Sequence, residues 1–151
     1  MFPSTVARVP RHTANRINAK IRYEMEARVR RIAAAGLEAI DQRLEELDRE
    51  WDIERTLEAN AATVTLAGAA LALFVDRRFA VVPLTVGAFL LQHATQGWCP
   101  PVPVFRRYGV RTQPEIERER YALKALRGDF QQVRADLPSA AVDRTLDAVD
   151  E

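Results

Sequence analysis

The sequence predicts an all-α fold: a two-helix transmembrane hairpin with amphipathic helical extensions on both sides. Two uncharged runs, residues 59–75 and 79–96, are separated only by Asp76, Arg77 and Arg78, whereas the rest of the chain is dense in charge. Aromatic residues make up only 7% of the chain, and Ala, Val and Leu dominate its apolar residues, which favours helix over sheet. Outside the two runs, apolar residues recur at spacings of three and four, as in amphipathic helices.

The bulk composition limits the possible classes of function. With 151 residues, the chain is long enough for one domain with a core. Its 22 basic and 21 acidic residues give a net charge of +1, so we expect no nucleic-acid partner, which usually requires a clustered basic excess. One cysteine and two histidines give no intrachain disulfide and no multi-cysteine metal site, so we expect no metal and no other cofactor. The first residues lack the apolar core of a secretory signal, so we expect the chain to begin in the cytoplasm.

Residues 1–12 are predicted to form a flexible arm, and residues 13–58 an amphipathic helical region. The first helix of this region should begin near Thr13 and end at Gly36. Its apolar stripe comprises Ile17, Ile21, Met25, Val29 and Ile32. The opposite face is rich in arginine. In one interpretation the stripe packs on a neighbouring helix; in the other, the helix lies on an anionic membrane surface.

A second helix is predicted from residue 37 to residue 58. Its apolar residues step by three and four, as in a coiled-coil seam, and comprise Leu37, Ile40, Leu44, Leu47 and Trp51. The pattern is too short for a free-standing coiled coil, which needs three or four heptads. The seam therefore packs either antiparallel on residues 13–35 or on a second subunit.

Residues 59–105 are predicted to form the membrane hairpin and a proline-rich exit. A spanning helix needs about 17–25 mostly apolar residues, and both uncharged runs lie at the lower limit. Gly68 and Gly87 are small enough to let another helix approach closely. The three-residue turn forces the two helices to lie antiparallel. In the alternative, the hairpin is buried in a soluble bundle, although a core helix there usually keeps one polar stripe.

Basic residues and tryptophans flank the hairpin. Six arginines near its two outer ends, against two in its turn, predict that both termini are cytoplasmic. We expect the following side chains at the membrane interface: Trp51, Trp98, Arg77, Arg78, Arg106 and Arg107.

The segment after the hairpin changes character twice. Three prolines within residues 100–103 should impose an extended, stiff segment. Residues 106–151 are predicted to be C-terminal cytoplasmic helices. The main one begins at Thr112, where Glu115 completes a capping box, and ends at Gly128. A last short piece, capped by Ser139, should be peripheral.

At Gly97-Trp98-Cys99-Pro100, after two short apolar helices, the chain resembles the YgaP-like transmembrane domain family. The Gly-containing turn that follows in that family would correspond to Tyr108-Gly109-Val110, so the resemblance covers roughly residues 60–110. It implies a small helical hairpin in a bacterial inner membrane. Some members carry a rhodanese sulfurtransferase domain, but this chain has no such anion-binding loop, so the resemblance does not imply sulfur transfer here.

Cys99 and His93 are the two candidates for chemistry. Arg106 and Arg107 follow Cys99 closely and could lower the pKa of its thiol, and the resemblance suggests a thiol or persulfide role. A cysteine and a histidine are the minimum for nucleophilic catalysis, but no orienting Asp or Asn is near in sequence. The competing interpretation is a packed, unreactive Cys99 and a hydrogen-bonded His93.

These observations predict a small bacterial integral membrane protein that acts as an accessory or scaffold subunit through helix packing. Its expected partners are membrane lipids and either a second copy of the chain or the other subunits of a membrane complex. No catalytic activity is assigned, so we do not expect an enzyme. Two alternatives stay open: a thiol or sulfur-handling membrane protein that uses Cys99, and a soluble helical interaction module.

Overall fold

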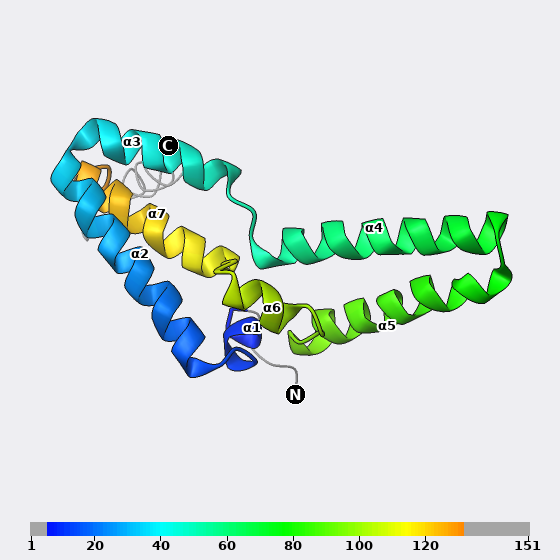
Figure 1. Cartoon of the computed structure of the whole chain (residues 1–151). Coiled ribbons are helices and arrows are strands. Elements are labelled where there is room, and N and C mark those ends of the chain that lie inside the picture. The colour runs from blue at the N-terminus through cyan, green and yellow to red at the C-terminus, as the bar shows by residue number, and fades with distance from the viewer. Residues whose placement is uncertain (1–5, 132–151) are drawn as a thin grey trace, which may run out of the picture. The chain divides into compact units, whose positions relative to one another are not determined.

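The computed structural model describes residues 6–131, and these residues form helices and connecting turns with no strand among them (Figure 1). The prediction of an all-α fold is therefore confirmed. The elements are α1 (Arg8–Arg11), α2 (Asn15–Ala35), α3 (Leu37–Arg49), α4 (Ile53–Phe74), the 3-10 helix η1 (Arg77–Ala80), α5 (Val81–Gln96), α6 (Val102–Arg107) and α7 (Gln113–Arg127). The predicted piece at Ser139 lies outside the described residues.

The described residues divide into two compact units. The first comprises residues 6–23 and 51–115, and the second comprises residues 24–50 and 116–131. Each unit is thus assembled from two separate stretches of chain. Helices α2 and α7 each contribute residues to both units.

In the first unit, α4 and α5 lie side by side and run in opposite directions, joined by η1 (Figure 1). We call them the apolar helix pair. The end with η1 is its tip, and the end where α4 begins and α5 finishes is its base. The two helices are in close contact at Gly68, where a Cβ atom would lie 2.7 Å from Val82 Cγ1 and 3.0 Å from Pro83 Cδ. Gly68 therefore packs between helices as predicted.

Local sequence fixes the start of α4 and the end of α5, which both lie at the base of the pair. The Asp52 side chain accepts a hydrogen bond of 2.8 Å from the Arg55 backbone N–H, a standard helix N-cap that sets the start of α4. This cap corrects the expected helix 37–58, which instead ends at Arg49. Gly97 ends α5 with φ of 79°, and its N–H donates to the His93 carbonyl at 2.7 Å.

The proline-rich exit is partly helical, which differs from the extended segment expected from its prolines. Pro101 precedes α6 as its N-cap, and Pro103 occupies the second helical position. Proline is tolerated there because the first backbone N–H groups of a helix have no intrahelical acceptor. The prolines therefore start a short helix instead of preventing one.

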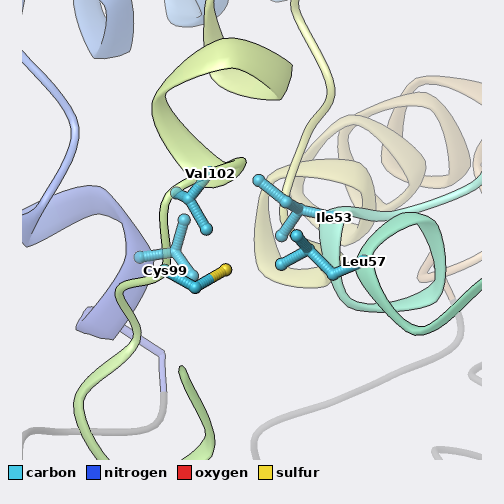
Figure 2. Packing of buried hydrophobic residues seen from close by; sticks show 5 residues of the cluster. Ile53, Leu57, Cys99 and Val102 are labelled. Atoms are coloured by element: carbon cyan, nitrogen blue, oxygen red, sulfur yellow. The ribbon is translucent and has the colours of Figure 1, made fainter. Parts of the chain in front are cut away.

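A small apolar core closes the base of the pair. Its buried residues are Val9, Ile53, Leu57, Cys99 and Val102. Figure 2 shows the Cys99 sulfur turned toward Ile53 and Leu57. Val9 comes from α1 and is only 2% exposed, so residues 8–11 of the expected flexible arm are helical and packed.

The second unit packs α3 against α7 and the later part of α2. Its core comprises Ile40, Leu44, Leu47, Ile116 and Leu123, with Val29 and Ile32 packed against it. The seam predicted on α3 is thus covered within the same chain. Two seam residues are exceptions: Leu37, at the first position of α3, is 60% exposed, and Trp51, which lies beyond the end of α3, is 49% exposed.

A buried carboxylate fixes these three helices to one another. Glu119 on α7 is fully buried and accepts hydrogen bonds from Arg28 Nε at 2.9 Å and Arg43 Nε at 2.8 Å. A buried charge without such donors is strongly unfavourable. The alternation of Glu and Arg along residues 115–120 gives no sign of this network in the sequence.

Candidate functional site

The apolar helix pair exposes most of its large apolar side chains. Phe74 is 85% exposed, Leu73 79% and Leu84 74%. Further exposed members are Val64, Leu66, Leu71, Val75, Phe79, Val81, Phe89 and Leu91. Monomeric soluble proteins rarely expose a continuous apolar surface of this kind. The pair is therefore the main candidate interaction surface.

One helix of the described part is long and apolar enough to cross a membrane, within Leu37–Phe74. The apolar stretch belongs to α4, because α3 is dense in charge. Core helices of soluble proteins also pass this test of length and hydropathy, but they are mostly buried. Only 11% of the stretch is buried, so the described residues leave most of it uncovered. Helix α5 has 16 residues, just below the range of about 17–25 that a spanning helix needs.

The tip of the pair is charged and exposed. The Asp76 side chain accepts a hydrogen bond of 2.8 Å from the Arg78 backbone N–H and so caps η1. Arg77 and Arg78 are both exposed. The two arginines that were predicted at a membrane interface are thus free to contact water or lipid headgroups.

At the base, Arg8 holds the two helices of the pair together. Its Nη2 donates to Glu54 Oε1 on α4 at 2.9 Å, and its Nη1 donates to the Ala94 carbonyl on α5 at 3.0 Å. Gly97 is required beside it, since a Cβ there would lie 2.6 Å from Arg8 Cβ and 2.7 Å from the Arg8 carbonyl carbon. The N-terminal helix therefore forms part of the base.

His93 completes this polar cluster. Its Nε2 lies 2.6 Å from Glu54 Oε2 and carries the proton of that hydrogen bond, because an ionised carboxylate only accepts. The bond from His93, together with Arg8, holds the pKa of Glu54 below its usual value despite burial. The histidine is 4% exposed, and its Nδ1 has no hydrogen-bond partner. These contacts show a structural His93, as in the competing interpretation of the sequence.

Cys99 does not have the environment of a reactive thiolate. It is 3% exposed, and burial raises the pKa of its thiol, outweighing a backbone hydrogen bond from Val102. The expectation that Arg106 and Arg107 lower this pKa is wrong. Because His93 Nδ1 is unpartnered and Nε2 is bonded to Glu54, the two residues do not form a nucleophile–base pair.

Arg106 is a structural residue and not an interface residue, which corrects the prediction. It is fully buried, with Nη1 2.6 Å and Nη2 2.8 Å from the two carboxylate oxygens of Glu115. Nη2 also donates to Asn18 Oδ1 at 2.9 Å. Burial raises the pKa of Glu115, but bonds from Arg106 and the Thr112 backbone N–H outweigh it and lower that pKa. The bond from Thr112 is one half of the predicted capping box.

Other predicted interface residues lie on the surface. Trp51 is 49% exposed, and the Arg55 guanidinium stacks 4.5 Å from the centre of its ring. Arg107 is exposed, and Trp98 is half-buried. Gly87 is also exposed, and a Cβ there would meet nothing within 4 Å. Unlike Gly68, it packs on no helix of the described chain.

Sequence reasoning missed Arg8, Glu54, Glu115 and Glu119 as partners of buried groups. Arg8 and Glu54 are 46 positions apart, and Arg28 and Glu119 are 91 apart. A single sequence contains no signal that couples such distant residues. No group of three or more His, Cys, Asp or Glu residues that could hold a metal ion occurs between residues 6 and 131.

No family model, no curated protein and no solved structure matches the chain. The apolar helix pair and its charged ends are the features of the described chain that bear on its function.

Proposed function

We propose that α4 and α5 form a transmembrane hairpin in a bacterial inner membrane, and that the protein acts as an accessory or scaffold subunit of a membrane assembly. The observation that supports the hairpin most directly is the exposed apolar surface of the pair, of which only a small part is covered by the chain. Each Leu or Phe side chain left in water forgoes about 1.5–3 kcal/mol of burial free energy. Lipid removes this cost without any partner protein.

The dimensions of the pair support insertion. The uncharged part of α4, residues 59–74, is about 24 Å long at 1.5 Å per residue. A bilayer has a hydrocarbon core of about 30 Å, so the pair is slightly short. The long side chains of Arg77 and Arg78 at the tip can bridge the difference by extending to the headgroups.

The distribution of arginines supports one orientation. Arginines are more numerous at the base than at the tip, which favours an orientation with the base and both ends of the described chain in the cytoplasm. The contacts at the base support an accessory role and not a catalytic one, because the buried polar groups near Cys99 hold helices together. On this view the charged helices of the second unit contact the partner subunits.

Two experiments test the proposal. Membranes that contain the protein are washed with carbonate at high pH, and we expect the protein to stay in the pellet until detergent is added. A Cys99→Ser variant is then given one new cysteine, either Arg77→Cys at the tip or Ala125→Cys on the exposed side of α7. A membrane-impermeant maleimide should label the tip cysteine in spheroplasts, and the α7 cysteine only after lysis. Release by carbonate alone, or equal labelling of both, contradicts the proposal.

A further inference from the structure

The first unit contains an apolar cavity of about 380 Å³ between α4 and α5. On α4 it is lined by Leu57, Ala61 and Val64, which lie on one face of the helix. Cys99 and Phe105 line it at the base. None of the groups assigned above to the polar cluster of the base lines this cavity, so it is a separate feature.

The cavity lies on the base side of a close contact between the two helices. At Gly68 they touch closely enough to leave no room for a Cβ. One turn closer to the base, Val64 lines the open space, and the next position on that face is the small Ala61. The opposite wall consists of the α5 residues Val86, Phe89 and Leu90.

The chemistry of the walls excludes charged ligands. No Lys, Arg, Asp or Glu side chain lines the cavity. The amide of Asn60, one of its few polar groups, already donates to the Thr56 carbonyl at 2.8 Å. An anion or a nucleotide would lose its hydration there without gaining a partner. The ligand class that fits is a hydrocarbon.

The size of the cavity suits a hydrocarbon group. An apolar cavity of about 150 Å³ in another protein binds benzene, so a cavity of about 380 Å³ has room for a longer hydrocarbon segment. From Leu57 to Val64 its α4 wall is about 10 Å long at 1.5 Å per residue.

We propose that this cavity binds one acyl chain of a bilayer phospholipid as a resident lipid. The proposal rests on the membrane insertion argued above. Two of the wall residues, Val64 and Phe89, are also part of the exposed surface of the pair, at 47% and 38% exposure, so the cavity is continuous with the surface that would face lipid.

The test uses the full chain in vesicles of phosphatidylethanolamine and phosphatidylglycerol. A small fraction of the phosphatidylethanolamine carries a diazirine on its acyl chain, and the adducts formed on illumination are mapped by mass spectrometry. We expect adducts on Cys99 and on the inward wall of α4 in addition to the outward residues Leu66 and Leu84. The replacement Ala61→Phe should remove most of the adducts on Cys99, because the larger side chain fills the cavity.

The adjacent Ala62 provides the matched control. It is exposed, so Ala62→Phe adds the same side chain on the outer side of α4 and should leave the Cys99 adducts unchanged. If Ala61→Phe does not fold, as judged by its helical circular dichroism, Val86→Phe fills the cavity from α5. Adducts on outward residues alone would overturn the acyl-chain site and leave the membrane hairpin intact. The absence of adducts from both helices would overturn the hairpin as well.

Discussion

The apolar helix pair and the second unit place their apolar residues in opposite ways. In the second unit, Ile40, Leu47 and Leu123 are at most 3% exposed. Most of the charged side chains of the same unit are exposed or half-buried. In the pair, Leu73 and Phe74 are among the most exposed residues of the described chain. The second unit thus buries its apolar side chains, whereas the pair leaves many of them exposed. On the proposed membrane insertion, this difference means that lipid surrounds the pair and water surrounds the second unit.

The two regions also use buried polar groups differently. Glu119 lies in the middle of the second unit and is bound by two arginines from different helices. In the first unit, buried polar groups such as His93 and Arg106 lie toward the base, where α4 begins and α5 ends, and not at the level of Gly68. Buried charged groups thus hold helices together in the second unit, whereas in the first unit buried polar groups close the base of the pair.

The largest effect is expected from the buried carboxylate of the second unit. Glu119→Ala leaves the guanidinium groups of Arg28 and Arg43 without this acceptor, and should lower the free energy of unfolding by about 3–5 kcal/mol. Denaturant titration in mild detergent measures it. Glu46, whose side chain is 65% exposed, also pairs with Arg43 and serves as control, since Glu46→Ala should cost less than about 1 kcal/mol. Similar losses for both would contradict the role given to burial.

The next effect concerns the base of the pair. Gly97→Ala combines a left-handed φ with a clash against Arg8, and we expect a loss of about 2–5 kcal/mol. Gly109→Ala has an equally unfavourable φ of 87° but open space around the new Cβ, so it should cost only about 1–2 kcal/mol. The difference between the two midpoints of unfolding isolates the contact with Arg8. Equal midpoints would show that α1 does not pack at Gly97.

Gly68 and Gly87 compare the inner and outer sides of the pair. A methyl group at Gly87 meets nothing and improves helix propensity, so Gly87→Ala should stabilise the protein by up to about 1 kcal/mol. At Gly68 the same change forces α4 away from Val82, and the overpacking exceeds the gain in propensity, for a net loss of about 1 kcal/mol. Thermal unfolding in detergent gives the sign of each change. Two shifts of the same sign would contradict the packing at Gly68.

A smaller effect is expected at the N-cap of α4. Asp52→Ala removes the acceptor for the Arg55 N–H and should cost about 1 kcal/mol, with fraying of the first turn. Asp76→Ala removes the corresponding bond at the tip, where only the four residues of η1 depend on it. Amide exchange at both positions should show faster exchange mainly in the first turn of α4. Faster exchange confined to the tip is the opposite result.

The smallest effect is a dependence on pH. Glu54 and Glu115 have pKa values lowered below the usual 4.5, so their stabilisation is present above that pH and is lost as the pH falls through their folded values. The unfolding temperature should therefore be steady near neutral pH and decrease below about pH 4.5. In Glu54→Gln the acid-induced decrease should be shallower. A protein that becomes more stable on acidification would contradict both assignments.

Periodic features of the fold were predictable from the sequence, and long-range polar contacts were not. The spacing of Ile40, Leu44 and Leu47 identified the buried face of α3, and Gly36 and Gly128 marked helix ends. The break before Ile53 was missed, because the apolar pattern continues through Trp51 and hides the cap at Asp52. Periodicity describes one helix at a time.

In the candidate site, too, the composition was predictable from the sequence and the long-range contacts were not. The exposed apolar pair and its charged tip were visible as composition, because the two runs contain no charge. The burial of Arg106 and the structural role of His93 were not, since both depend on partners brought close by the fold: Glu115 and Glu54. Trp51 and Arg107 lie on the surface, whereas Arg106, with the same flanking position, is buried, so position beside the hairpin does not by itself determine exposure.

The order of synthesis gives the Arg8 contact a further consequence. Arg8 bonds to the Ala94 carbonyl 86 positions later, Asn18 to Arg106 88 positions later, and Arg28 to Glu119 91 positions later. Neither unit can therefore be completed before the ribosome has produced the whole apolar pair. On the proposed insertion of α4 and α5, these long-range contacts form only after the apolar pair has been synthesised. A change that delays insertion should then also delay the formation of these contacts.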